Sequence, residues 1–175
     1  MSAVGSFDLW GDRQLERLRG NAIADPLFKT ASFVGDFSGI WHAIGVGRVL
    51  ADRSNARQAL AMSALIGAES LLVNQGVKRL FRRVRPTETG DPRFQVRRPS
   101  TTSFPSGHAS AAFFAAAILT TATGKSLAPV WYSTATVIAL SRAYVRIHHP
   151  SDVVVGAALG AALGVVGSRL FELVT

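Results

Sequence analysis

Three short stretches of the sequence carry side chains whose types and spacing could act together on a phosphate group. The first runs from Lys78 to Pro86, the second is Pro105 to His108, and the third runs from Ser141 to Asp152. Each stretch lies at one end of a long apolar segment. If these segments are helices that alternate in direction, all three stretches meet at the same end of the fold. The sequence therefore predicts one polar site there.

The first stretch supplies two cations. Lys78 and Arg85 are seven residues apart, which is two turns of a helix that Pro86 would end, so both are expected on one helix face. Two neighbouring cations repel each other unless an anion lies between them. Basic residues at a membrane boundary explain this pair equally well, and they are the better explanation for Arg79, Arg82 and Arg83.

The second stretch is typical of a helix start that binds anions. Ser106 is a suitable N-cap, and the unpaired backbone amides of the first turn carry the positive end of the helix dipole. Gly107 allows an oxyanion close to the backbone, and His108 can donate a proton near neutral pH. An ordinary capped helix with a histidine at the membrane interface is the competing interpretation.

The third stretch combines a guanidinium, an imidazole and a carboxylate. Arg142 offers a planar fork that matches phosphate oxygens. His148 and Asp152 are four residues apart, so the carboxylate can hold one imidazole nitrogen as N–H and leave the other free to attack. His149 has no such partner by spacing and is treated as a bystander.

Together these residues predict phosphoryl transfer through a phosphohistidine that water later hydrolyses. His148 attacks, Asp152 orients it, and His108 protonates the leaving alkoxide. The expected phosphate cage consists of Lys78, Arg85, Ser106, Gly107 and Arg142. The cations take the part that magnesium plays in kinases. The sequence has no acidic cluster with metal-ligand spacing, so we expect no metal and no other cofactor.

The composition indicates an apolar body with basic ends. The chain has 175 residues, of which 48% are hydrophobic and only 17% charged, yet its formal net charge is +8. We expect a single domain over residues 1–175. The absence of cysteine excludes a disulfide framework, a thiolate metal site and a cysteine nucleophile. With this apolar content, nucleic acid is not an expected partner.

The elements that must position the site are expected to be helical throughout, because no alternating strand pattern of useful length occurs. We expect an all-α integral membrane helical bundle with about five transmembrane helices in residues 31–175, and a buried soluble bundle is the alternative. Glycines at every fourth position of the last segment would let another helix approach closely. The apolar segments are Ala31–Leu50, Gln58–Val77, Ser106–Thr123, Leu127–Leu140 and Val153–Val174, and the glycines are Gly156, Gly160 and Gly164.

Residues 1–25 precede the core. Phe7 to Arg19 has the spacing of an amphipathic helix, which we expect to lie in the membrane interface, with a surface helix of a soluble domain as the alternative.

The three stretches read K-x6-RP, PSGH and SR-x5-H-x3-D, and on these residues the sequence resembles the type 2 phosphatidic acid phosphatase superfamily. The resemblance implies a helical core, His148 as the nucleophile, His108 as the acid and phosphate binding by the remaining motif residues. It also implies an integral membrane lipid phosphatase. Vanadium-dependent haloperoxidases share the motifs, but they are larger and soluble.

The resemblance further implies a phosphoric monoester hydrolase that acts on a membrane lipid. The small size and the alanine- and arginine-rich composition are similar to the actinobacterial branch that acts on decaprenylphosphoryl-5-phosphoribose in cell-wall arabinan precursor synthesis. Polyprenyl diphosphates, phosphatidylglycerophosphate and phosphatidic acid are the alternative substrates. A non-enzymatic membrane scaffold that binds anionic lipids is the alternative of another class.

The loop Thr87–Phe104, Glu69 and the oligomeric state each allow more than one interpretation. The loop Thr87–Phe104 could contact a lipid head group through Arg93, Arg97 and Arg98, or simply touch anionic lipid. Glu69 lies inside an apolar segment, where a hydrogen bond between helices would account for it. The sequence also leaves a homo-oligomer open.

The basic residues predict the orientation in the membrane. With five crossings, 14 Lys and Arg fall on the side of the predicted site and 5 on the other, and without Lys78, Arg85 and Arg142 the comparison is 11 to 5. Because cytoplasmic loops carry the excess of basic residues, we expect a multi-pass protein of the plasma (inner) membrane with a cytoplasmic active site.

Overall fold

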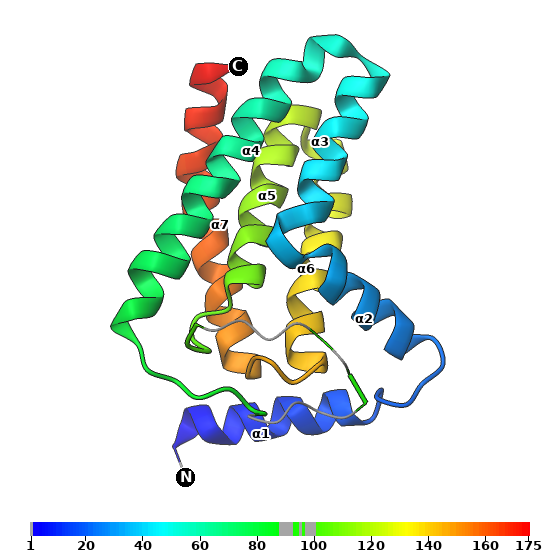
Figure 1. Cartoon of the computed structure of the whole chain (residues 1–175), viewed down its shortest axis with the longest axis vertical. Helices are drawn as coiled ribbons and strands as arrows, with labels where there is room; N and C mark the ends of the chain where they lie inside the picture. The colour runs from blue at the N-terminus through cyan, green and yellow to red at the C-terminus, as the bar shows by residue number, and fades with distance from the viewer. Residues whose placement is uncertain (1, 88–92, 95, 97–100) are drawn as a thin grey trace.

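The computed structural model describes residues 2–87, 93, 94, 96 and 101–175, and within these ranges the chain is all-helical, without a strand. A bundle of long helices stands on α1, which lies across one end of it (Figure 1). In chain order the elements are α1 (Ala3–Glu16), α2 (Ala24–Val34), η1 (Asp36–Ser38), α3 (Gly39–Ala51), η2 (Arg53–Asn55), α4 (Ala56–Leu71), η3 (Leu72–Gly76), η4 (Val77–Leu80), α5 (Gly107–Thr123), η5 (Lys125–Leu127), α6 (Ala128–Tyr144) and α7 (Pro150–Val174).

Four of the five expected apolar segments form helices near the expected bounds, and α6 continues through Ser141 as far as Tyr144. The expectation for the first segment, a continuous helix over Ala31–Leu50, is wrong. The chain breaks at η1, where Phe37 and Ser38 have left-handed backbone angles, with φ of 53° and 59°. A left-handed residue cannot continue a right-handed helix, so α3 starts afresh at Gly39.

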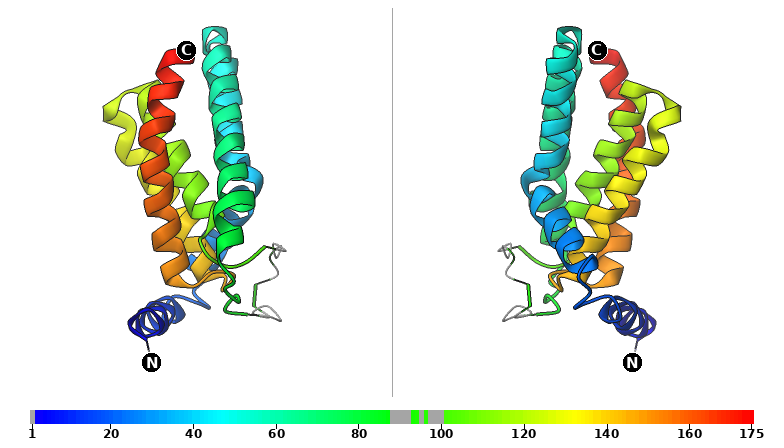
Figure 2. Two further views of the ribbon diagram at one scale, coloured as in Figure 1. Left: turned by 90° about the vertical axis from the view of Figure 1, so that its left-hand side faces the viewer. Right: turned by 90° about the vertical axis from the view of Figure 1, so that its right-hand side faces the viewer.

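Helix α5 forms the centre of the core. It packs against α4, α6 and α7. Helices α3 and α4 form a layer beside α5, α6 and α7 (Figure 2). Its buried side chains are mostly small, so neighbouring helices can approach it closely. The main core cluster includes Trp41, Met62, Ile66, Phe114, Ile118, Leu119, Ile138 and Phe171.

The glycines of α7 face α5, as the spacing predicted. A Cβ atom on Gly156 would overlap the carbonyl oxygen of Ser106, and one on Gly160 would overlap the backbone of Ser110. Gly164 is buried in the same way against Ala117. Because only glycine leaves this space, the two backbones lie in direct contact, and this contact fixes the start of α5 relative to the start of α7.

The outer surface of the bundle is apolar. Exposed large side chains include Leu60 and Leu71 on α4 and Val154, Val165 and Leu173 on α7. Among the described residues, two helical stretches are long and apolar enough to cross a membrane, Arg53–Leu80 and Pro150–Val174.

The expected N-terminal helix corresponds to α1. Its buried positions are Asp8 and Gly11, whereas Phe7 and Trp10 are exposed. Helix α1 therefore faces the bundle with a polar and small-residue side and turns its aromatic side outward.

Candidate active site

The three motif stretches meet at the end of the bundle that α1 crosses, as their alternation predicted (Figure 1). The side chains of this site are almost fully enclosed, with exposed fractions of 6% or less for Lys78, Arg85, Ser106, Arg142, His148 and Asp152. A cavity of about 490 Å³ is lined by Lys78, Gly107, His108 and His148. The structure thus brings Lys78, Gly107 and both motif histidines to one cavity, whereas Arg85, Ser106 and Arg142 are not among the residues that line it.

The two cations of the first stretch do not share a helix face, so this part of the prediction is wrong. Lys78 lies in η4, and the helix ends at Leu80, five residues before Arg85. The chain then runs extended because residues near Arg83 bond to the segment before Pro105. Thr102 Oγ1 accepts from the Arg83 amide at 2.8 Å, and the Ser103 amide donates to the Arg83 carbonyl at 2.9 Å.

Arg85 reaches the site from this extended segment. Its guanidinium donates to the carbonyl oxygens of Ile147 at 2.6 Å and Thr101 at 3.0 Å. These bonds place its Nη1 atom 3.2 Å from Nε2 of His148. Lys78 is fixed nearby, because its Nζ lies 3.3 Å from Thr101 Oγ1. The same loop therefore holds both cations beside the histidine.

The histidine and carboxylate of the third stretch face each other as predicted. His148 Nδ1 lies 3.6 Å from Asp152 Oδ2, slightly longer than a hydrogen bond. Burial lowers the pKa of the His148 imidazole to about 3, although the Asp152 carboxylate opposes the shift. The ring is therefore neutral at pH 7, and Nε2, the nitrogen next to Arg85, is the one that faces away from the carboxylate.

The second stretch opens α5 as expected. Ser106 is the N-cap and its hydroxyl accepts from the Ala109 amide at 3.4 Å, while its own amide donates to the carbonyl of Asp152 at 3.0 Å. A Cβ atom at Gly107 would lie 2.8 Å from Asn74 Oδ1, so a larger residue would disturb the cavity wall. These contacts join the start of α5 to the start of α7.

Arg142 is held on one side only. Its Nη1 donates to the hydroxyl of Ser32 and lies 3.7 Å from Asp36 Oδ1. Its Nε and Nη2 atoms have no hydrogen-bond partner among the described residues, although the side chain is 1% exposed. Buried donors without partners are rare in native proteins, and they suit a site that receives an anion.

Sequence reasoning missed the carboxylate that holds His108. Asp36 Oδ1 lies 2.8 Å from His108 Nε2, and Asp36 reaches this position because η1 breaks the helix there. A charged residue within the apolar segment Ala31–Leu50 was the available signal. Ser32 and Ser103, which hold Arg142 and Asp152, carry no signal in a single sequence.

The structure also corrects the role predicted for Arg83. The sequence favoured a membrane-boundary role for Arg79, Arg82 and Arg83, but Arg83 forms ion pairs with Asp8 at 2.5 Å and with Asp152 at 2.6 Å. Arg79 and Arg82 are exposed.

The remaining features fall outside the site. His149 caps α7, and its ring lies 3.2 Å from the Val84 carbonyl. Glu69 accepts a hydrogen bond from Ser110 between α4 and α5, as anticipated. Arg93 pairs with Glu16 at 2.8 Å, while Arg97 and Arg98 lie outside the described residues. No group of three or more His, Asp or Glu residues suited to a metal occurs in the part of the chain that the structure describes.

The motifs and the fold agree with comparisons to known proteins. Residues 58–174 match the model of the PAP2 superfamily, and the chain belongs to this family. The match contains all three motif stretches but neither α1 nor Asp36.

Two curated relatives are named decaprenylphosphoryl-5-phosphoribose phosphatase. The one from Mycobacterium tuberculosis is 43% identical over 90 residues, which cover 51% of this chain and 49% of the relative, so the match spans about half of that protein. The one from Mycolicibacterium smegmatis is 34% identical over 131 residues, which cover 73% of this chain and 68% of the relative.

Two solved structures have the same fold. A transmembrane PAP2 type phosphatidylglycerolphosphate phosphatase from Bacillus subtilis superposes with a TM-score of 0.75 at 22% identity, covering 100% of this chain and 89% of its own. LpxE from Aquifex aeolicus gives a TM-score of 0.72 at 23% identity, covering 92% and 94%.

Proposed function

We propose that this protein is a phosphatase that hydrolyses a phosphomonoester of a membrane lipid through a phosphohistidine at His148. The observation that carries the proposal is the buried His148, whose Nε2 lies 3.2 Å from Arg85 and which lines a cavity together with Lys78 and His108. A nucleophile beside cations and opposite a proton donor is the arrangement that phosphoryl transfer needs.

In the first step, His148 Nε2 attacks phosphorus and the P–O bond of the ester breaks. His108, held by Asp36, gives its proton to the leaving alkoxide. His148 keeps its proton on Nδ1 and gains positive charge, which the Asp152 carboxylate stabilises at close range. The cage cations, Lys78, Arg85 and Arg142, together with the Gly107 amide, offset the charge on the equatorial oxygens. The Ser106 amide, which the sequence assigned to the cage, donates to the Asp152 carbonyl instead.

In the second step, water attacks the phosphohistidine. His108 takes a proton from this water, the P–N bond breaks, and inorganic phosphate leaves with neutral His148 restored. Both steps use only groups of this chain, so the reaction as written needs no metal and no other cofactor.

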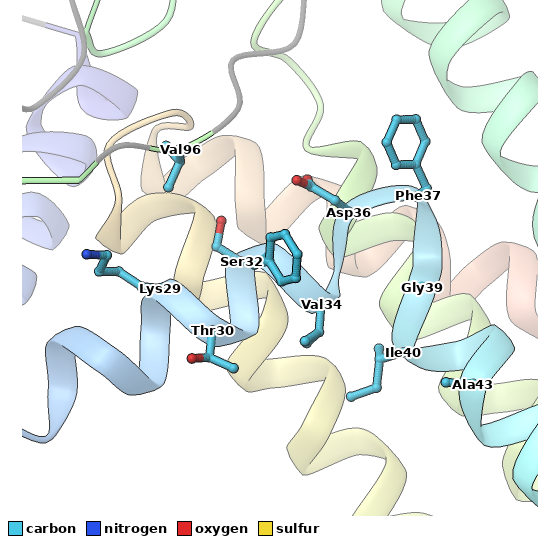
Figure 3. A pocket seen from close by; sticks show the side chains of 11 residues that line it. Lys29, Thr30, Ser32, Val34, Asp36, Phe37, Gly39, Ile40, Ala43 and Val96 are labelled. Carbon is cyan, nitrogen blue, oxygen red and sulfur yellow. The ribbon is translucent and has the colours of Figure 1, made fainter.

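The substrate is proposed to be a polyprenyl-linked phosphate such as decaprenylphosphoryl-5-phosphoribose. The names of the two curated relatives support this substrate. An open groove of about 970 Å³ beside the site adds support, because apolar side chains such as Val34, Phe37 and Ile40 dominate its lining (Figure 3). The groove shares Asp36 and Phe37 with the catalytic cavity, so a lipid chain could lie there while its phosphate enters the cage.

The proposed setting is the plasma (inner) membrane. We place five crossings in the bundle as a single membrane-embedded domain, with α1 in the interface on the active-site side. The exposed apolar side chains of α4 and α7 and the outward Phe7 and Trp10 support this arrangement. The excess of basic residues near α1 supports a cytoplasmic active site.

Phosphate release from a panel of purified lipid phosphates tests the proposal. We expect the polyprenyl-linked phosphoribose to be hydrolysed faster than a polyprenyl diphosphate, phosphatidylglycerophosphate or phosphatidic acid. Preference for one of those lipids would refute the proposed substrate but leave the proposed phosphatase reaction standing. If no lipid phosphate is hydrolysed, the enzyme proposal fails and the anionic-lipid scaffold takes its place. If His148→Ala keeps full activity, the phosphohistidine at His148 is refuted.

A further inference from the structure

A chain of ion pairs connects the N-terminal helix with the proposed catalytic carboxylate. Asp8 on α1 accepts from Nη2 of Arg83 at 2.5 Å, and Nη1 of Arg83 donates to Asp152 Oδ1 at 2.6 Å. Asp8 is 6% exposed and Asp152 is fully buried. The Arg83 side chain between them is 26% exposed, so the two carboxylates are the enclosed partners of these ion pairs. Partly buried ion pairs are screened less by salt than exposed ones.

Helix α1 is also fixed against the start of α7. Asp8 Oδ1 accepts from the amide of Ser151 at 2.8 Å, and Asp8 Oδ2 accepts from the Ser151 hydroxyl at 3.0 Å. Three residues along α1, a Cβ atom on Gly11 would lie 2.8 Å from Pro150 Cγ. The contact therefore has one register, in which Asp8 meets Arg83 and Ser151.

These contacts leave Asp152 little freedom. Its Oδ1 is taken by Arg83, and its Oδ2 accepts from the Ser103 hydroxyl at 2.5 Å and from the His149 amide at 2.9 Å. The remaining direction of Oδ2 is toward Nδ1 of His148, at 3.6 Å. The angle and distance of the carboxylate to the nucleophile thus depend on Arg83. Arg83 in turn is held by Asp8 and by the Ser151 hydroxyl, which accepts from its Nη1 at 2.8 Å.

A second cavity supports the same connection. It measures about 530 Å³, and its lining includes Asp8, Arg83 and His148. The cavity that α1 helps to line therefore also borders His148.

We propose that Asp8 and Arg83 are positioning residues for the proposed hydrolysis: α1 sets the Asp152 carboxylate that orients His148. The inference rests on the proposed function. It assigns a role in the reaction to α1, which lies outside the residues that match the family model. Neither Asp8 nor Arg83 touches the phosphate in this account, so their removal changes the rate of phosphoryl transfer and not the binding of the anion.

The test compares Asp8→Asn and Arg83→Gln with Asp12→Asn in the full-length protein. Asp12 is a matched control on the same helix, because it pairs with Arg19 at 2.7 Å and Arg146 at 2.8 Å and has no bond to Asp152. We expect kcat to fall about tenfold or more in Asp8→Asn and Arg83→Gln, with KM and inhibition by orthovanadate changed less than about threefold. Asp12→Asn should keep the wild-type kcat, because the contacts of Asp8, Gly11 and Glu16 still hold α1 in place.

A double-mutant cycle and a spectroscopic signal separate positioning from general loss of structure. In the Arg83→Gln background, Asp8→Asn should cost almost nothing further, because its effect passes through Arg83. The 15N signals of His148 should show an Nδ1–H ring in the wild type and a mixture of tautomers in both variants. Asp8→Glu should recover part of the rate.

Three results would overturn the inference. They are an unchanged kcat in both variants, an equal loss in Asp12→Asn, or additive losses in the double variant. A wild-type protein without phosphatase activity would instead refute the proposed function itself, so the two failures are distinguishable.

Discussion

At the scale of the residue, two histidines in one cavity have different partners, and these partners divide their roles. His148 faces Asp152 through Nδ1 and Arg85 through Nε2, so a lone pair is directed at the cage. His108 faces the Asp36 carboxylate through Nε2 at 2.8 Å. These partners distinguish the two rings, in keeping with the proposed attack by His148 and the proposed proton donation by His108.

The role of His108 predicts a dependence on the leaving group. His108→Gln should lower kcat for an alkyl phosphate by about 10²- to 10⁴-fold, which is the usual contribution of general acid catalysis. For an aryl phosphate such as p-nitrophenyl phosphate, whose leaving group needs no proton, phosphorylation of His148 should be much less affected. Rapid-quench measurement of the first turnover on both substrates tests this. Equal losses on the two substrates would contradict the role of His108 as acid.

At the scale of the element, α1 is held by charges as well as by Gly11. Hydrogen bonds from Arg93 and Arg19 lower the pKa of Glu16 to about 2. Burial opposes the shift of Asp12, but the guanidinium groups of Arg146 and Arg19 lower its pKa below the ordinary value of 3.8. Carboxylates with lowered pKa values stabilise the folded state above their ordinary pKa, and this contribution is lost as the pH falls toward the lowered value.

We therefore expect α1 to loosen on acidification, starting near the ordinary value of 4.5 for Glu16 and continuing to about 2. The chain has no cysteine, so one spin label on Ser6→Cys reports the mobility of α1 alone. The label should be immobile at pH 6 and mobile near pH 3. In a variant with both Glu16→Gln and Asp12→Asn, the mobility should no longer change with pH. A label that stays immobile in the wild type at pH 3 would show that other contacts hold the helix.

The contact between α5 and α7 gives a second prediction for an element. Gly160→Ala places a methyl group into the backbone of Ser110 and should destabilise the fold by about 1–3 kcal/mol or more. Gly47→Ala on α3 is the matched control, because nothing lies within 4 Å of its Cβ position. Alanine there should be neutral or stabilise by about 0.5–1 kcal/mol. Thermal unfolding in detergent compares the two, and equal stabilities would refute the close α5–α7 contact.

At the scale of the whole molecule, the candidate active site lies at one end of the bundle. Helix α1 lies at one end, where the chain also enters α5 and α7, and the C-terminus lies at the other (Figure 1). The proposed cytoplasmic active site therefore requires a C-terminus outside the cytoplasm. A fluorescent protein that matures only in the cytoplasm should stay dark when fused there, while a secreted-type phosphatase reporter should be active. Fluorescence from this fusion would mean that the C-terminus is cytoplasmic and that the proposed orientation is wrong.

The sequence predicted the convergence of the three motif stretches because each lies at the end of a periodic apolar segment. It failed where the backbone departs from helical periodicity. Lys78 and Arg85 were assigned to one helix, but the helix ends at Leu80, and bonds to Thr102 and Ser103 keep the chain extended. Asp36 acquires its role through the break at η1. Neither event can be recognised from local spacing, because long-range contacts and left-handed residues cause it.

The central claim is the covalent phosphohistidine at His148, and trapping it is the most direct test. The protein is mixed with a lipid whose cleaved phosphate carries ³²P, the reaction is stopped within one turnover, and the labelled peptide is identified. We predict a label on the peptide containing His148 that is stable in base and labile in acid, and that is absent from His148→Ala. Rapid phosphate release without any label on His148, or a label on another residue, would contradict the mechanism.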